Sequence, residues 1–81
     1  MTHQVCWSVP ALDRAAGFLR TDPAGVAEVM DGVDGLAADP YGGGSVPLGV
    51  PAVRRARIGR YRVLYELAGG ELTVVHLGRI D

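Results

Sequence analysis

Five of the eight arginines in this chain lie within residues 54–62, at positions Arg54, Arg55, Arg57, Arg60 and Arg62. A guanidinium group is planar, stays charged at physiological pH and donates two parallel hydrogen bonds to phosphate or carboxylate oxygens. The chain contains no lysine. A coding bias explains the choice of arginine over lysine, but it does not explain the clustering. The spacing therefore favours a site that binds an anion, either a nucleic-acid backbone or an acidic protein segment.

Residues 54–67 are predicted to form two antiparallel strands, because Gly59-Arg60 supplies a two-residue turn with glycine first. Directly opposed residues share a face of such a pair, and side chains alternate along each strand. Arg55, Arg57 and Arg62 then share one face, while apolar residues fill the other. Arg57 lies directly opposite Arg62, and like charges so placed repel each other by about 0.2–1 kcal/mol per pair. We therefore expect an anion or an acidic partner over this face.

A second turn at Gly69-Gly70 predicts that a last strand, residues 72–77, pairs with residues 61–67. If this pairing runs without interruption, Arg79 projects from the same face as the other strand arginines, and His76 projects into the core. We interpret His76 as a hydrogen-bonded core histidine, although a bulge of one residue would turn it outward.

The first half of the chain predicts a strand at residues 3–8 and two helices, at residues 10–20 and 23–38, with Asp22 as the N-cap of the second. The apolar residues at helical spacing are Leu12, Ala15, Ala16 and Leu19 in the first helix, and Val26, Val29, Met30, Val33, Leu36 and Ala37 in the second. Residues 39–51 are turn-forming and predict a loop. The order β-α-α-β-β-β predicts an α+β fold, with the helical hairpin on one face of a mostly antiparallel sheet and the arginines on the other.

Length and composition narrow the possibilities. The 81 residues predict one domain, 1–81, and 48% hydrophobic residues are too many for a disordered chain. Residues 1–53 carry six acidic residues and two arginines, a net charge of −4, whereas residues 54–81 carry +3, and this separation indicates a partner. A lone Cys6 permits neither a disulfide nor a zinc site. Because no signal peptide or membrane span is evident, we expect a cytoplasmic protein without a membrane partner. We also expect neither a metal ion nor a cofactor.

The two strand segments together resemble a known family. Residues 55–66, with the core Gly-x-Tyr-Arg-x-x-Tyr at 59–65, and residues 72–79, an apolar strand ending in Gly-Arg, are similar to the RelE/ParE superfamily of type II toxins. Upstream segments agree, with Trp7-Ser8 before Pro10-Ala11-Leu12 and residues 36–40 before a glycine-rich loop. The resemblance covers nearly the whole chain.

The resemblance implies a bacterial toxin that a cognate antitoxin holds inactive, with operator DNA bound only through the complex of the two. RelE-like members enter the ribosomal A site and cleave mRNA, which inhibits translation. ParE-like members inhibit DNA gyrase and are not enzymes. We favour the RNA-cleaving interpretation, in which ribosome and mRNA are partners. The alternatives are a gyrase inhibitor and a catalytically weak module that only binds its antitoxin.

The resemblance also implies roles for individual residues. Arg62 matches the arginine at the scissile phosphate, and Arg55 and Arg57 match the basic residues of the preceding strand. Arg79 matches a basic position near the C-terminus only loosely. Glu66 is a candidate base, although an ion pair with Arg55 is the more ordinary role. The predicted catalytic residues are Arg62, Arg57, Arg79 and Glu66, and the predicted RNA-binding residues are Arg54, Arg55 and Arg60. The C-terminal tyrosine of RelE-like members and a lysine-type base are absent from the sequence.

Overall fold

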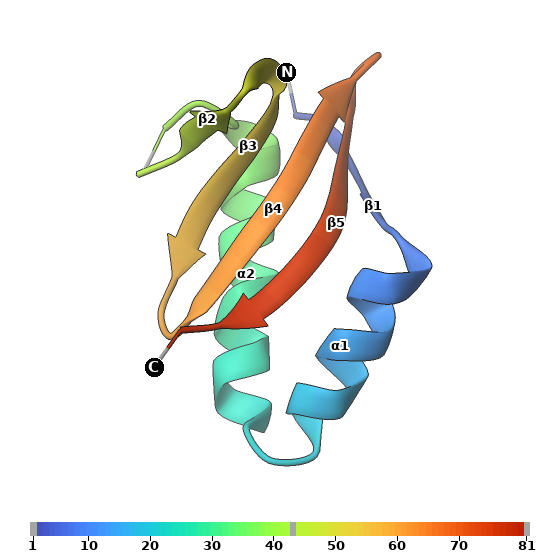
Figure 1. Ribbon diagram of the computed structural model, residues 1–81, viewed down its shortest axis with the longest axis vertical. Coiled ribbons are helices and arrows are strands. Elements are labelled where there is room, and N and C mark those ends of the chain that lie inside the picture. The colour runs from blue at the N-terminus through green and yellow to red at the C-terminus, as the bar shows by residue number, and fades with distance from the viewer. Residues whose placement is uncertain (1, 43, 81) are drawn as a thin grey trace.

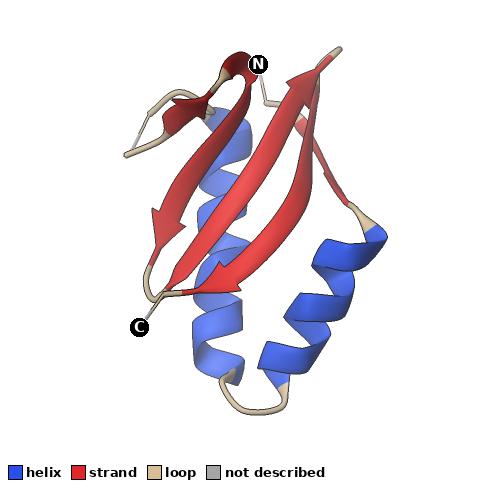
Figure 2. Cartoon of the chain, in the orientation of Figure 1, coloured by secondary structure: helices blue, strands red, loops and turns tan. Residues whose placement is uncertain are grey.

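Two helices cover one face of a five-stranded sheet and leave the opposite face uncovered (Figure 1 and Figure 2). This computed structural model describes residues 2–42 and 44–80. The elements are β1 (Gln4–Trp7), α1 (Val9–Leu19), α2 (Pro23–Ala38), β2 (Val46–Leu48), β3 (Val50–Ile58), β4 (Tyr61–Ala68) and β5 (Glu71–Arg79). The predicted α+β fold, with a helical hairpin on one side of the sheet, is confirmed.

The sheet has the strand order β1-β5-β4-β3-β2, in which β1 runs parallel to β5 and all other neighbours are antiparallel. The predicted β3–β4 register is confirmed, since Arg57 pairs with Arg62 and Ile58 with Tyr61. Gly59 has a φ of +59°, which a turn with glycine first requires. The strand β2 was not predicted. Its residues belong to the expected loop, but the chain turns at Gly49, and they pair with Val50, Arg54 and Arg55 of β3.

Both helices begin at side chains that cap them. The Ser8 hydroxyl accepts a hydrogen bond from the Ala11 amide (3.2 Å), and the Asp22 carboxylate accepts one from the Gly25 amide (3.1 Å). Each bond satisfies one of the amides that a helix leaves without a partner in its first turn. Asp22 is therefore the N-cap that the sequence predicted.

The predicted buried stripe of α1 is wrong except at Ala15. Leu12 and Leu19 are 48% and 52% exposed, whereas Ala11 and Ala15 are buried and Phe18 is half-buried. Ala11, Ala15 and Phe18 also follow helical spacing, so α1 has two apolar stripes. Ala11 and Ala15 belong to the core cluster and Phe18 packs against it, so this stripe and not the leucines faces the core. In α2 the predicted stripe is buried except for Met30, which is 38% exposed.

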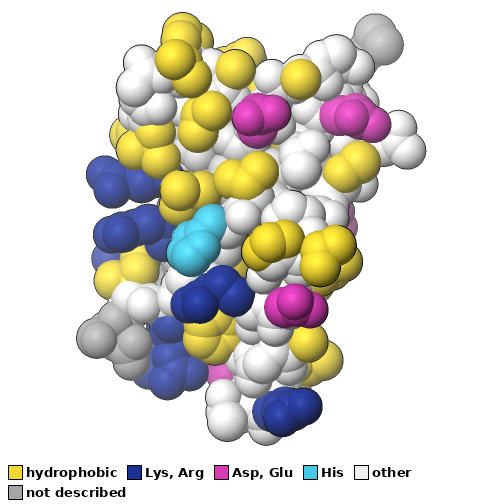
Figure 3. Space-filling view, turned by 45° about the vertical axis from the view of Figure 1, so that its right-hand side comes forward, with side chains coloured by type: hydrophobic (Ala, Val, Ile, Leu, Met, Phe, Trp, Pro, Cys, Tyr) yellow, Lys and Arg dark blue, Asp and Glu magenta, His cyan; other side chains and the backbone are white. Residues whose placement is uncertain are grey.

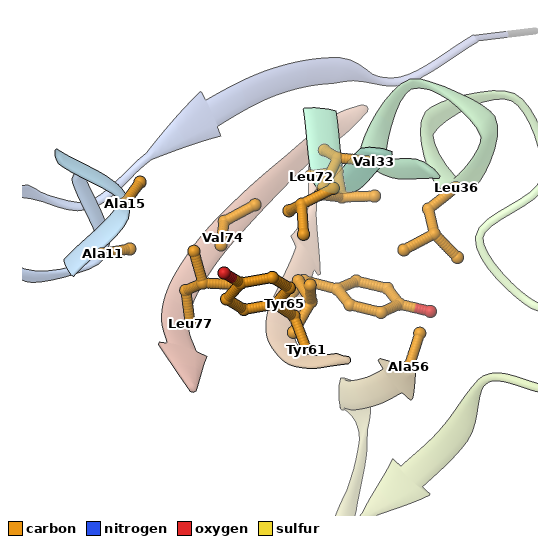
Figure 4. Close-up of a cluster of buried hydrophobic side chains, with 12 residues drawn as sticks. Ala11, Ala15, Val33, Leu36, Ala56, Tyr61, Tyr65, Leu72, Val74 and Leu77 are labelled. Atoms are coloured by element: carbon orange, nitrogen blue, oxygen red, sulfur yellow. The ribbon is translucent and has the colours of Figure 1, made fainter. Parts of the chain in front are cut away.

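Two tyrosines of β4 lie at the centre of the core between the sheet and the helices (Figure 4). Tyr61 and Tyr65 are fully buried, so each phenolic hydroxyl needs a hydrogen-bond partner. The Tyr61 hydroxyl donates to Asp22 Oδ2 (2.8 Å), and the Tyr65 hydroxyl donates to the Pro40 carbonyl oxygen (2.5 Å). These bonds tie the strand to the start of α2 and to the segment that follows it.

A β-bulge at Val75 interrupts the predicted pairing of β5 with β4. Tyr65 pairs with Val74, but Leu64 pairs with His76, so Val75 is an extra residue. Ser8 supports this irregularity, because its amide donates to the Val74 carbonyl (2.9 Å) and its hydroxyl donates to the Val75 carbonyl (3.3 Å). Beyond the bulge every side chain of β5 lies on the face opposite to the one predicted.

Candidate nucleic-acid interface

Three arginines of the uncovered sheet face surround one depression. Arg55 and Arg57 of β3 and Arg62 of β4 line a hollow of about 220 Å³, which we call the arginine hollow. Its remaining described lining residues are Gly44, Val46 and Ile80. Arginine side chains, in dark blue, gather along one side of the space-filling view (Figure 3). The sequence prediction that these three arginines share one face is therefore confirmed.

The guanidinium groups of the arginine hollow have few partners within the protein. Arg57 Nε donates to the Gly59 carbonyl oxygen (3.1 Å). Within residues 2–42 and 44–80, Arg55 and Arg62 form no hydrogen bond or ion pair, and no acidic residue lines the hollow. Their donors therefore face solvent, where a phosphate group could accept two parallel hydrogen bonds from one guanidinium. The mutual repulsion of the three cations also favours an anion at this position.

Glu66 lies on the same face but outside the arginine hollow. Its register partners are Val53 on β3 and Thr73 on β5, and its side chain is exposed. The structure shows no ion pair between Glu66 and Arg55 among the residues it describes. The carboxylate is therefore not held against the arginines.

Arg79 lies on the opposite face from the one we predicted. Because the bulge shifts the register, Arg79 pairs with Tyr61 and hydrogen-bonds the Tyr61 hydroxyl on the helix side of the sheet. The same Tyr61 hydroxyl donates a hydrogen bond to Asp22 Oδ2. The hydrogen bond from Tyr61, then that from the Gly25 amide, and then nearby arginine charge lower the pKa of the Asp22 carboxyl below its usual value. Arg79 therefore belongs to a structural cluster at the start of α2.

Arg54 also lies on the helix side of the sheet. Its Nε donates to Ser45 Oγ (2.7 Å), and its guanidinium lies over the Tyr41 ring at 4.9 Å from the ring centre. These contacts hold the chain segment before β2 in place. Arg60 occupies the turn between β3 and β4, where its carbonyl oxygen accepts a hydrogen bond from the Ile80 amide (2.7 Å). Neither residue lines the arginine hollow.

The arrangement of helices and strands matches several solved toxin structures. Among them are a YoeB/ParE toxin from Agrobacterium tumefaciens (TM-score 0.80, 22% identity, covering 96% of this chain and 98% of that chain) and the toxin–antitoxin complex RelBE2 from Mycobacterium tuberculosis (0.81, 19%, 98% and 99%). A third is the chromosomal ParDE system from P. aeruginosa (0.74, 18%, 99% and 98%). The chain has the RelE/ParE fold. No protein-family model and no curated protein matches the sequence.

The uncovered sheet face of this RelE/ParE fold also carries a residue that we expected in the core. His76 pairs with Leu64 beyond the bulge, and its side chain is exposed. The sequence contained a signal for this, since the buried residues of β5 are Leu72, Val74 and Leu77. Their spacing changes from two to three between Val74 and Leu77, and such a break in alternation marks a bulge.

In the part of the chain that the structure describes, no other group of side chains points to catalysis. Among the described residues, no group of three or more His, Cys, Asp or Glu side chains is placed to hold a metal ion. The Cys6 thiol is half-buried and contacts Glu71 Oε2 (3.7 Å), and burial and the Glu71 charge raise its pKa. A raised pKa favours the protonated thiol, whereas the nucleophilic form of cysteine is the thiolate. None of the described helices is long and apolar enough to span a membrane.

Proposed function

We propose that this protein is the toxin of a type II toxin–antitoxin system and that it cleaves mRNA on the ribosome, as RelE-like toxins do. The observation that carries this proposal is the arginine hollow on the uncovered sheet face. Three guanidinium groups surround a depression with no acidic residue among its described lining residues. Such a site suits a phosphodiester that develops extra negative charge during cleavage.

The reaction of this class is a transesterification within RNA. The ribose 2′ oxygen attacks the adjacent phosphorus, the bond from phosphorus to the 5′ oxygen breaks, and a 2′,3′-cyclic phosphate and a 5′ hydroxyl result. Arg57 on β3 and Arg62 on β4 are register partners, and both side chains line the arginine hollow. They would bind the phosphate and stabilise the charge on its oxygens, and Arg55 would orient the neighbouring nucleotide. Holding the 2′ oxygen in line with the breaking bond supplies much of the acceleration.

A cognate antitoxin is the partner that this proposal requires. The relative from Mycobacterium tuberculosis was solved as a toxin–antitoxin complex, which supports a partner of this kind. An acidic antitoxin segment over the arginine hollow would neutralise Arg55, Arg57 and Arg62 and block access of RNA. Operator DNA would be bound through this complex, and the site of action would be the cytoplasm.

A gyrase inhibitor of the ParE type is the second candidate. Two observations favour it: the fold is shared with a ParDE system, and two predicted catalytic residues lie outside the arginine hollow. Glu66 is not held against the arginines, and Arg79 lies on the other face. In this case the arginines would contribute little to toxicity.

The deciding experiment compares Arg62→Ala with the parent protein after induction in cells. Primer extension on a reporter transcript measures mRNA cleavage, and plasmid supercoiling is assayed in parallel. Loss of a contact made to the transition state costs on the order of 10²–10³ in rate. We expect Arg62→Ala to abolish growth arrest and cleavage, with supercoiling unchanged in every strain. Arg62→Lys should retain only part of the growth arrest and the cleavage, because a point charge does not reproduce the two parallel hydrogen bonds.

Arg20→Ala is the matched control. Arg20 is an exposed arginine at the end of α1 and does not line the arginine hollow, so its removal should leave cleavage unchanged. Circular dichroism of both variants establishes that they fold. A folded Arg62→Ala protein as toxic as the parent would overturn the RNA-cleaving proposal. Relaxed plasmid DNA in that strain would assign the protein to the gyrase inhibitors.

A further inference from the structure

The lining of the arginine hollow suits a phosphate group, but none of its described side chains moves a proton near neutral pH. Its described side chains are arginine, valine and isoleucine, besides a glycine. Arginine stays protonated throughout the physiological range. Cleavage by a ribose 2′ hydroxyl nevertheless requires that a base take the hydroxyl proton. A group outside the described lining has to take this proton, and side chains at the border of the hollow are the nearest candidates in this chain.

The bulge at Val75 brings one imidazole to this border. His76 projects from the same face as Arg62, because it pairs with Leu64 and Gly78 pairs with Arg62. A Cβ atom built on Gly78 would lie 3.1 Å from His76 Nε2. The ring therefore leans along β5 over the backbone of Gly78, directly across from Arg62. Figure 3 shows a histidine side chain on the surface beside arginine side chains.

Glycine at position 78 leaves room for this placement. A Cβ there would be closer to His76 Nε2 than most such contacts, and the exposed ring would have to shift by a few tenths of an ångström. The distance across an antiparallel pair is about 4.5–5.5 Å between opposed Cα atoms. A ring above Gly78 is thus one strand spacing from the Arg62 backbone, whose side chain enters the hollow.

The charges around His76 come from three elements. On β4, Arg62 and Glu66 lie on either side of its register partner Leu64. From α1, Arg14 Nε donates to the carbonyl oxygen of Leu77, the next residue of β5 (2.5 Å). On β5 itself, Arg79 projects from the opposite face. Of these charged groups, Arg62 is the one that lies on the same face as His76 and also lines the arginine hollow.

We propose that His76 is the proton-transfer group of this site and that it takes the proton of the ribose 2′ hydroxyl. This inference rests on the proposed RNA-cleaving function. As the neutral imidazole accepts that proton, the 2′ oxygen forms a bond to phosphorus and the bond to the 5′ oxygen breaks. The leaving 5′ oxygen takes a proton from water, and the imidazolium later returns its proton to solvent. Arg62 stabilises the charge on phosphorus oxygens that this step increases.

The first test measures whether His76 belongs to the site, and it does not depend on cleavage. Imidazole NMR signals are followed while a 2′-O-methyl RNA trinucleotide, which cannot react, is added to the parent protein. We expect the His76 signals to shift and those of His3, which precedes β1 beside the Gly69-Gly70 turn at the other end of β5, to stay unchanged. In Arg62→Ala the His76 shift should shrink. Binding that leaves the His76 signals unmoved would overturn the inference.

The second test measures the chemistry on programmed ribosomes. His76→Gln keeps a polar side chain of similar reach but cannot act as a base near neutral pH, and losing a positioned base costs about 10²–10⁴ in rate. We expect a loss of this size, together with loss of the acidic limb from the pH–rate profile. His3→Gln is the control and should cleave like the parent. Trinucleotide affinity should be nearly unchanged in His76→Gln, since the arginines remain.

The outcomes separate this inference from the function on which it rests. If the parent cleaves and His76→Gln cleaves at the same rate with the same pH profile, the role of His76 is overturned while the proposed function stands. If a 5′-thio leaving group restores the rate of His76→Gln, the residue protonates the leaving oxygen, and its role as base is overturned. If the parent does not cleave at all, the proposed function and the base role fail together.

Discussion

Replacing Tyr65 with phenylalanine removes one buried hydroxyl and should destabilise the protein measurably. Tyr65 is fully buried, and its hydroxyl donates to the Pro40 carbonyl oxygen (2.5 Å) and contacts Ser45 Oγ. Phenylalanine fills the same volume, so the core itself stays packed. The buried Pro40 carbonyl loses its donor, and an unsatisfied buried acceptor costs about 1–3 kcal/mol. For a domain of this size, each kcal/mol lowers the melting temperature by roughly 4–8 °C.

Thermal unfolding followed by circular dichroism measures the effect, with Tyr41→Phe as the matched control. Tyr41 is 63% exposed and lies under the Arg54 guanidinium. Phenylalanine keeps the ring there, so the control should stay within about 0.5 kcal/mol of the parent. We expect Tyr65→Phe to melt roughly 5–20 °C lower. If the two variants melt together, the assigned hydrogen bond does not stabilise the fold.

The same substitution should also affect the site. Ser45 lies between Gly44 and Val46, two residues that line the arginine hollow, and Arg54 holds Ser45 through its Nε. Loss of the Tyr65 hydroxyl removes one of the two side-chain anchors of Ser45. We therefore expect weaker binding of the unreactive trinucleotide by Tyr65→Phe at a temperature where it is still folded. Equal affinity would show that the rim of the hollow does not depend on this anchor.

Two further predictions concern α2. Gly35→Ala should raise the free energy of unfolding by about 0.5–1 kcal/mol, because alanine favours a helix and its Cβ would meet no atom within 4 Å. Gly32→Ala should gain less or lose stability in the same melts, since its Cβ would lie 2.6 Å from Ile58 Cδ1. Hydrogen bonds led by that from Tyr61 lower the folded-state pKa of Asp22. The stabilisation that ionised Asp22 gives the folded state is thus fully present above the unfolded pKa of about 3.9 and is lost as pH falls through the folded pKa. Asp22→Asn should therefore reduce the loss of the free energy of unfolding that the parent shows at acidic pH.

The sequence predicted the parts of the fold that depend on local signals. Gly59-Arg60 and Gly69-Gly70 set the hairpins, and a two-residue turn leaves little freedom in the register beside it. The second helix was likewise predictable, since Asp22 and Pro23 mark its start. The faces of Arg55, Arg57 and Arg62 follow from that register. Turn geometry thus brings the three arginines of the hollow together, while Gly44, Val46 and Ile80 reach it through other parts of the fold.

The parts that were not predicted depend on tertiary contacts. Strand β2 forms because Val46–Leu48 meets the free edge of β3, and nothing local distinguishes it from a loop. The buried stripe of α1 depends on packing against core residues of β5, which the helical spacing alone does not specify. The bulge at Val75 is held by Ser8, which is far away in the sequence. Each of these contacts joins segments that a reading of local pattern treats separately.

The bulge decides which residues can take part in chemistry. Side chains alternate along a strand, so one extra residue exchanges the two faces for everything beyond it. Uninterrupted pairing would have placed Arg79 beside the other arginines and buried His76. With the bulge, Arg79 instead joins Tyr61 and Asp22 at the start of α2, and His76 reaches the face of Arg62. The bulge thus exchanges a fourth cation on this face for an imidazole, which under the proposed function is the group that accepts a proton during RNA cleavage.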